Sequence, residues 1–130
     1  MHHQISGTKL NRDTGQRLAL LKGLAGAIIR SEAIETTEPK AKAAKTLIEK
    51  LVTHARKASL TDIRQIETVI SDHELVQKLV HVIAPRYKSQ PGGYLRLVKL
   101  GNRAGDNAPM VRMEFVTASE KKAPKKTKSK

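Results

Sequence analysis

The sequence predicts an α+β domain with two layers, in which helices cover a small three-stranded sheet. Two patterns of apolar residues carry this prediction. Val111, Met113 and Phe115 alternate with polar residues, a period of two that places the apolar side chains on one face of a strand. Between residues 41 and 55, apolar residues recur instead at helical spacing. With the other segments added, the expected order is a helix, a strand, three helices and two strands.

The chain divides into an arm, one globular domain and a tail. Residues 1–12 carry Lys9 and Arg12 and few apolar side chains, so they are expected to form an extended, basic N-terminal arm. Residues 13–116 make up the predicted domain. Residues 117–130 alternate lysine with small residues and proline, and this composition predicts a disordered tail because it cannot form a core.

The first two helices have recognisable starts. Asp13 followed by Gln16 resembles a capping box, and the apolar run that follows continues the first helix. Residues 33–37 are too few and too rich in β-branched side chains to extend this helix, so they are predicted to be a strand of the same sheet as the later pair. Thr37 is the expected N-cap of the second helix, with Pro39 in its first turn.

The third and fourth helices are also marked by capping residues. Ser59 with Asp62 opens the third helix, and Asp72 opens the fourth. Pro85 is expected to end the fourth helix, because a proline disfavours helical backbone at the residue before it, here Ala84.

A hairpin follows, with strands predicted at residues 94–100 and 110–116. The loop between them is longer than most hairpin loops, and its glycines, asparagines and proline favour sharply turning backbone. Asp106 is expected to accept backbone hydrogen bonds that hold this turn. A long, shaped loop on a small sheet is where a functional surface is expected.

The net charge is the strongest compositional signal. A formal charge of +13 repels itself in a compact chain and normally indicates an anionic partner. The few aromatic residues argue for contacts to phosphate and to folded shape rather than base stacking. The absence of cysteine excludes disulfides and thiolate metal sites and fits a cytoplasmic location. No apolar run has the length of a signal peptide or a membrane span, so no membrane partner is expected.

No catalytic or metal-binding grouping is marked in the sequence. The histidines lack the spacing of a zinc site, and no serine lies in a nucleophile elbow. Gly92 and Gly93 precede a strand rather than leading from a strand into a helix, so they do not match a phosphate-binding loop. We therefore expect no enzyme activity, no cofactor, no metal and no small-molecule substrate.

What remains is a cationic surface spread over the arm, the second helix, the hairpin and the tail. On the second helix, lysine and arginine far outnumber the single acid after its first turn, Glu49, which favours a polyanion. Acids outnumber bases between residues 62 and 78, so this part is expected to face away from that partner. Contacts to several phosphates would give strong, salt-sensitive binding without any base being read.

Four motifs, in order and with fitting spacing, resemble the family of bacterial large ribosomal subunit protein seventeen. The resemblance extends from about residue 6 to residue 116 and excludes the tail. The motifs are Ser6-Gly7-x-Lys9-Leu10-Asn11-Arg12, Ile34-x-Thr36-Thr37-x-x-Lys40-Ala41-Lys42, Gly92-Gly93-Tyr94-x-Arg96 and Arg103-Ala104-Gly105-Asp106-Asn107-Ala108-Pro109-Met110.

The resemblance implies a structural protein, without catalysis, that binds 23S ribosomal RNA of the large subunit near the exit side of the peptide tunnel, in the cytoplasm. It also implies ribosomal protein neighbours, namely proteins twenty-two and thirty-two. The residues expected to contact RNA, from the motifs and from neighbouring cations, are Lys9, Asn11, Arg12, Arg17, Lys40, Lys42, Lys45, Arg96, Lys99, Arg103 and Asn107. Those expected to shape loops are Gly92, Gly93, Gly105, Asp106 and Pro109.

Two other functions are compatible with the charge. The first is that of a nucleoid-type DNA-binding protein, which would bind duplex DNA of any sequence with similar affinity. A small RNA-processing enzyme would need a carboxylate or histidine whose removal abolishes turnover.

Overall fold

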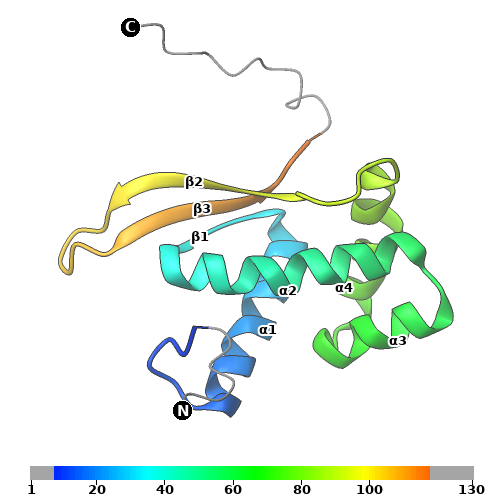
Figure 1. Cartoon of the computed structure of the whole chain (residues 1–130), viewed down its shortest axis with the longest axis horizontal. Helices are drawn as coiled ribbons and strands as arrows, with labels where there is room; N and C mark the ends of the chain where they lie inside the picture. The colour runs from blue at the N-terminus through cyan, green and yellow to red at the C-terminus, as the bar shows by residue number, and fades with distance from the viewer. Residues whose placement is uncertain (1–7, 118–130) are drawn as a thin grey trace, which may run out of the picture.

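The computed structural model describes residues 8–117, so the predicted tail beyond Thr117 and the first seven residues of the arm lie outside the described residues. The predicted α+β class is confirmed (Figure 1). The helices are α1 (Thr14–Ser31), α2 (Glu38–Lys57), α3 (Leu60–Val69) and α4 (His73–Lys78), followed by a π turn (Leu79–Ile83) and a 3₁₀ turn (Ala84–Tyr87). The strands are β1 (Ala33–Thr37), β2 (Leu95–Asn102) and β3 (Pro109–Phe115).

The three strands form one antiparallel sheet in the order β1-β3-β2. The expectation that the early strand joins the hairpin is therefore confirmed, with β3 in the centre. Met113 lies opposite Ile34 on one side and opposite Leu97 on the other, so apolar side chains form a row across the sheet. A register shift between Lys99 and Gly101 interrupts the pairing of β2 with β3.

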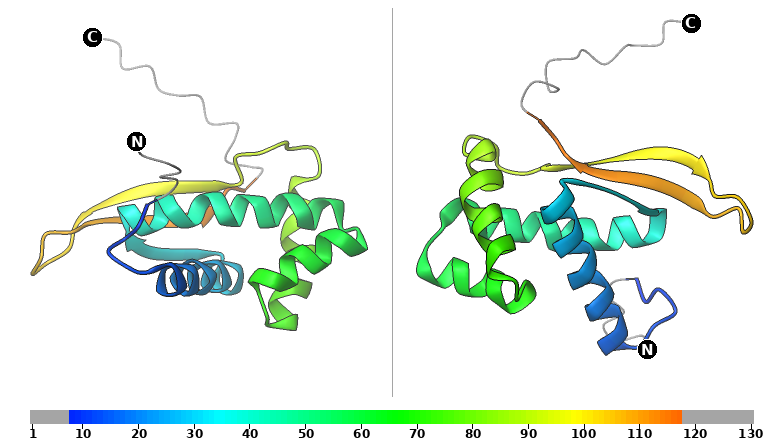
Figure 2. Two further views of the ribbon diagram at one scale, coloured as in Figure 1. Left: turned by 60° about the horizontal axis from the view of Figure 1, so that its bottom comes forward. Right: turned by 180° about the vertical axis from the view of Figure 1, so that it is seen from behind.

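The core lies between this sheet and α2. Figure 1 shows α2 running along one side of the sheet, with α1 beside it and α3 and α4 gathered at the end away from the hairpin loop. Ile48 and Val52 of α2 and Met113 of β3 have no exposed surface, and Val111 has almost none. The hairpin projects beyond the first residues of α2 (Figure 2), which leaves its loop uncovered by helices.

The helix starts follow the predicted capping residues, with one exception. The side chains of Asp13, Ser59 and Asp72 accept hydrogen bonds from backbone N–H groups in the first turns of α1, α3 and α4. Thr37 occupies the N-cap position of α2, but its side chain makes no capping hydrogen bond. Pro39 stands at the second helical position and has no N–H to donate, which removes one of the two usual donors.

The prediction that the helical path ends before Pro85 is wrong. Ala84 has helical backbone angles (φ −59°, ψ −37°), and its N–H donates to the carbonyl of Leu79, five residues earlier. This wider π turn changes the backbone path just before the proline, whose ring in a regular α-helix would clash with the carbonyl four residues earlier. The chain then continues as a 3₁₀ turn to Tyr87.

This continuation brings the three aromatic residues of the chain together. The ring of Tyr87 lies 5.2 Å from the ring of Tyr94 and 6.4 Å from that of Phe115, measured between centroids. The hydroxyl of Tyr87 donates to the carbonyl of Val116 at 2.7 Å. The cluster joins the end of the helical layer to the sheet, so these rings serve the core.

A core substitution tests the observed register. Met113→Ala should lower the free energy of unfolding by about 2–5 kcal/mol, because it leaves a cavity between the sheet and α2. Leu100→Ala, on the exposed part of β2, should cost about 0.5 kcal/mol or less. Urea denaturation measures both, and equal losses would contradict the burial of Met113.

Candidate nucleic-acid interface

A groove lies between the arm, α1 and α2. Arg17 and Leu21 line it from α1, and Lys42 and Lys50 line it from α2. Thr8 of the arm closes one side. The groove therefore combines an apolar floor with basic side chains on both walls, a surface that can accept a phosphate chain.

A second hollow extends this groove towards the hairpin. Thr8 and Lys42 line both, and the second hollow ends at Pro109, where β3 begins. Lys42 pairs with Glu38 at 2.8 Å, and this hydrogen bond holds the pKa of Glu38 below its ordinary value, with a smaller contribution from the charge of Lys99. Lys99 is thus close enough to act on the same part of the surface.

The arm reaches the groove through a tight turn. The N–H of Arg12 donates to the carbonyl of Lys9 at 3.1 Å, and Leu10 and Asn11 both have left-handed backbone, with φ of 55° and 53°. The guanidinium of Arg12 donates to the carbonyl of Leu10, so this side chain folds back onto its own turn. Lys9 and Asn11 remain exposed.

The hairpin loop is held by its own side chains. Arg103 donates two hydrogen bonds to the carboxylate of Asp106, at 3.1 and 2.6 Å. Asp106 also accepts from the N–H of Ala108, and the backbone of Arg103 bonds to both Ala108 and Asn107. Left-handed backbone at Gly105 and Asn107 completes the turn. The loop therefore projects as a defined shape, with the charge of Arg103 balanced by Asp106.

The segment before β2 is shaped in a similar way. The side-chain amide of Gln90 donates to the carbonyls of Gly92 and Gly93, at 2.7 and 2.9 Å. Gly93 has left-handed backbone, with φ of 68°. The turn places Tyr94 at the edge of the core, where its hydroxyl accepts a hydrogen bond from Arg56 at 2.7 Å.

The predicted contact residues do not all meet at the groove. The side chain of Arg96 lies on the other face of the sheet from that of Leu97, and it forms an ion pair with Glu114. Arg112 pairs with the same carboxylate at 3.0 Å, and hydrogen bonding to Arg96 is the main cause that lowers the pKa of Glu114. The groove itself gathers Arg17 and Lys42, while Lys40 and Lys45 lie half-buried along α2.

Lys50 is a groove residue that the sequence-based set of contacts omits. It lines the groove together with Lys42 and Thr46, which precede it at steps of four along α2. That spacing places the three residues on one helical face and was the available signal. Thr8, in the arm, is also absent from that set.

One grouping of serine, histidine and acid does exist, although the sequence does not mark it. His54 lies 2.8 Å from one oxygen of Asp62, and the hydroxyl of Ser59 donates to the other. The acid stands between the other two groups, so the histidine is not placed to take the serine proton as in a catalytic triad. The hydrogen bond from Ser59, and then that from His54, lowers the pKa of Asp62. The grouping ties α2 to α3.

Two classes of site are absent from the described residues. Residues 8–117 hold no group of three or more metal-ligating side chains. None of their helices is long and apolar enough to cross a membrane.

The fold and the groove define a small basic α+β domain with a surface suited to a polyanion. The family model for ribosomal protein L17 matches residues 20–116, which is well over half of the chain. The chain belongs to the ribosomal protein L17 family and is thus a ribosomal protein of the large subunit. The matched residues include α2, the hairpin and its loop.

The ion pair in the hairpin loop has a measurable signature. The pKa of Asp106 lies at about 2, mainly because of its hydrogen bonds to Arg103 and then to the N–H of Ala108. The stability that the ionised carboxylate of Asp106 gives to the folded loop is therefore present above pH 3.8, the ordinary pKa of this group. It is lost as the pH falls towards 2. We expect Arg103→Gln to raise the pKa of Asp106 towards its ordinary value of 3.8. Carboxyl NMR signals recorded over a pH series measure this pKa.

Arg112→Gln provides the matched control, because Arg112 pairs with Glu114 in the sheet and not with Asp106. The midpoint of Asp106 should stay at about 2 in this variant. A wild-type midpoint near the ordinary value would show that the loop is not held by this pair.

Proposed function

We propose that this chain is a structural constituent of the large ribosomal subunit that binds folded 23S ribosomal RNA through the groove and the hairpin, and thereby supports translation. The observation that carries this proposal is the basic groove that joins the arm, α1, α2 and the start of β3 in a chain of the L17 family. In the ribosome the protein lies near the exit side of the peptide tunnel, beside ribosomal proteins twenty-two and thirty-two.

The arrangement of charge supports a defined orientation on the RNA. Residues 8–12 of the arm and the hairpin loop lie away from α3, as Figures 1 and 2 show. The stretch from α3 to α4 carries Asp62, Glu67, Asp72 and Glu74. Phosphate attracts the basic end and repels the acidic end, so the groove and the hairpin face the RNA.

The shape of the contact surface suits folded RNA better than generic duplex. The hairpin loop is a projection held by Arg103 and Asp106, and the arm turn is fixed by the backbone bond from Arg12 to Lys9. Such preformed projections fit crevices of a folded RNA, which is recognised largely through shape, phosphate and 2′-hydroxyl groups. Both lie at the basic end of the molecule.

Sedimentation of a cell lysate through a density gradient tests the proposal. The tagged full chain should comigrate with the large subunit and stay there through a moderate-salt wash. A chain found free, or with the nucleoid, would overturn the proposal in favour of the DNA-binding alternative. Turnover of an RNA substrate by the purified chain would favour the enzyme alternative instead.

A matched pair of arginine variants tests the groove. Arg17→Gln should weaken binding to 23S ribosomal RNA and lower the slope of log affinity against log salt by about 0.7 to 0.9, the loss of one phosphate contact. Arg64→Gln removes the same charge from the exposed side of α3 and should leave the slope unchanged. Filter binding over a salt series measures both, and equal slopes would exclude Arg17 from the contact.

A further inference from the structure

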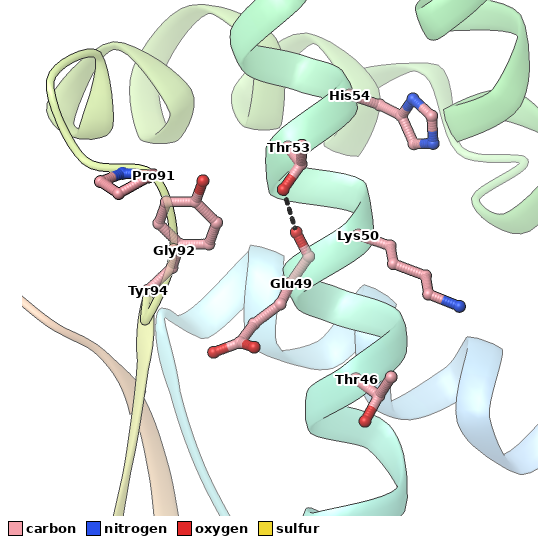
Figure 3. Close-up of a pocket in the computed structure, with 8 residues that line it drawn as sticks. All are labelled: Thr46, Glu49, Lys50, Thr53, His54, Pro91, Gly92 and Tyr94. Carbon is pink, nitrogen blue, oxygen red and sulfur yellow. Dashed lines mark hydrogen bonds between the residues drawn. The ribbon is translucent and has the colours of Figure 1, made fainter.

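A separate hollow lies on the other side of α2, between that helix and the segment before β2 (Figure 3). Thr46, Glu49 and Thr53 line it from the helix, and Pro91 and Gly92 line it from the segment. Its volume is about 330 Å³, at the lower end of the range for small-molecule sites. Tyr94, a core residue, forms part of the wall.

Glu49 is the feature of this hollow that the fold does not explain. Its Oε1 atom is buried and has no hydrogen-bond partner among residues 8–117. Thr53 donates to the backbone carbonyl of Glu49 at 3.0 Å, so this hydroxyl does not serve the carboxylate (Figure 3). A buried carboxylate oxygen without a donor is costly, so a donor from a bound molecule would remove this cost.

The basic side chains near the hollow do not donate a hydrogen bond to Oε1 of Glu49. Lys50 borders the hollow but does not donate to Oε1 of Glu49, and Arg56, which donates to the hydroxyl of Tyr94 in the wall, leaves its own buried Nε without a partner among residues 8–117. His54 also borders the hollow, and its Nδ1 is already engaged by Asp62 at 2.8 Å. Figure 3 shows Glu49 extending towards the segment of Gly92, while Lys50 extends from another side of the helix.

Lys50 connects this hollow to the groove proposed to hold RNA, because it lines both. A phosphate held by Lys50 would bring the base of the same nucleotide to the hollow. A Cβ atom at Gly92 would meet nothing within 4 Å, so the space beside this residue is open.

The chemistry of the carboxylate selects among the bases. Two adjacent acceptor oxygens match two adjacent donors, and guanine presents N1–H and an amino group side by side on its pairing edge. Adenine and cytosine place an acceptor nitrogen next to their amino group, which would face a carboxylate oxygen. Uracil offers a single donor between two acceptors. Rotation about the last torsion of Glu49 is soft, so the carboxylate can turn to present both oxygens.

We propose that this hollow binds an unpaired guanine of the ribosomal RNA, with the carboxylate of Glu49 accepting from the base and Lys50 contacting its phosphate. This inference rests on the proposed function, because it takes the RNA in the groove as the source of the base. It adds a base-reading contact to an interface otherwise made of phosphate and shape contacts.

Titration of the full chain with mononucleotides tests the site, with the backbone amide NMR signals of Thr53, Gly92 and Gly93 as the readout. Guanosine monophosphate should bind about tenfold more tightly than inosine monophosphate, which lacks the amino group, and than adenosine or uridine monophosphate. Glu49→Gln should abolish this preference. Glu67→Gln, an exposed substitution of the same kind on α3, should preserve it.

Three results would overturn the proposal. If inorganic phosphate shifts the amide signals as much as guanosine monophosphate does, the site binds only the phosphate and not the base. Stronger shifts with N-acetylarginine amide, lost in Glu49→Gln, would assign the hollow to a basic side chain of a neighbouring protein. If none of the probes shifts these signals, the hollow does not bind them.

Sedimentation separates this inference from the proposed function. Glu49→Gln retains every basic residue of the groove, so the variant should still comigrate with the large subunit. A wild-type chain that comigrates but shows no guanine preference leaves the proposed function standing and removes the inference. A wild-type chain absent from the large subunit removes the proposed function itself.

Discussion

The central position of β3 is the constraint on which the rest of the structure depends. Its apolar face packs on α2, and its two edges pair with β1 and β2. Met113 therefore contributes to the core and to both strand pairings at once. The N–H of Phe115 donates to the carbonyl of Glu32, and that of Val116 donates to Tyr94, so the end of β3 is also fixed to the start of each neighbouring strand.

The basic surface follows from this framework. α2 begins directly where β1 ends, which sets its first turn beside the start of β3 and brings Lys42 towards the hairpin. Because one face of α2 is buried against the sheet, its lysines border the hollows on either side. The same helix thus supplies both the core and the charge, with Ile48 facing inwards and Lys50 facing outwards.

Much of the fold was predictable from local patterns, because alternation and helical spacing report directly on buried faces. The strand order was not, since the alternation of β3 is compatible with either neighbour. The path past Pro85 was missed because local preference excludes an α-helix there but not a π turn. The spacing of Lys42, Thr46 and Lys50 marks one face of α2, but the fold was needed to show that α1 and Thr8 complete a groove over that face and that Arg96 lies on the other face of the sheet.

The order β1-β3-β2 also determines how the chain can fold as it is synthesised. β1 and β2 do not pair with each other, and their common partner is the last of the three strands in residues 8–117 to emerge. The helices can form earlier from local contacts, but the sheet stays unformed until the residues of β3 are available, because β3 is the partner in both strand pairings. Folding of this domain is therefore completed by its final strand, and a chain stopped before Pro109 lacks the whole sheet rather than a part of it.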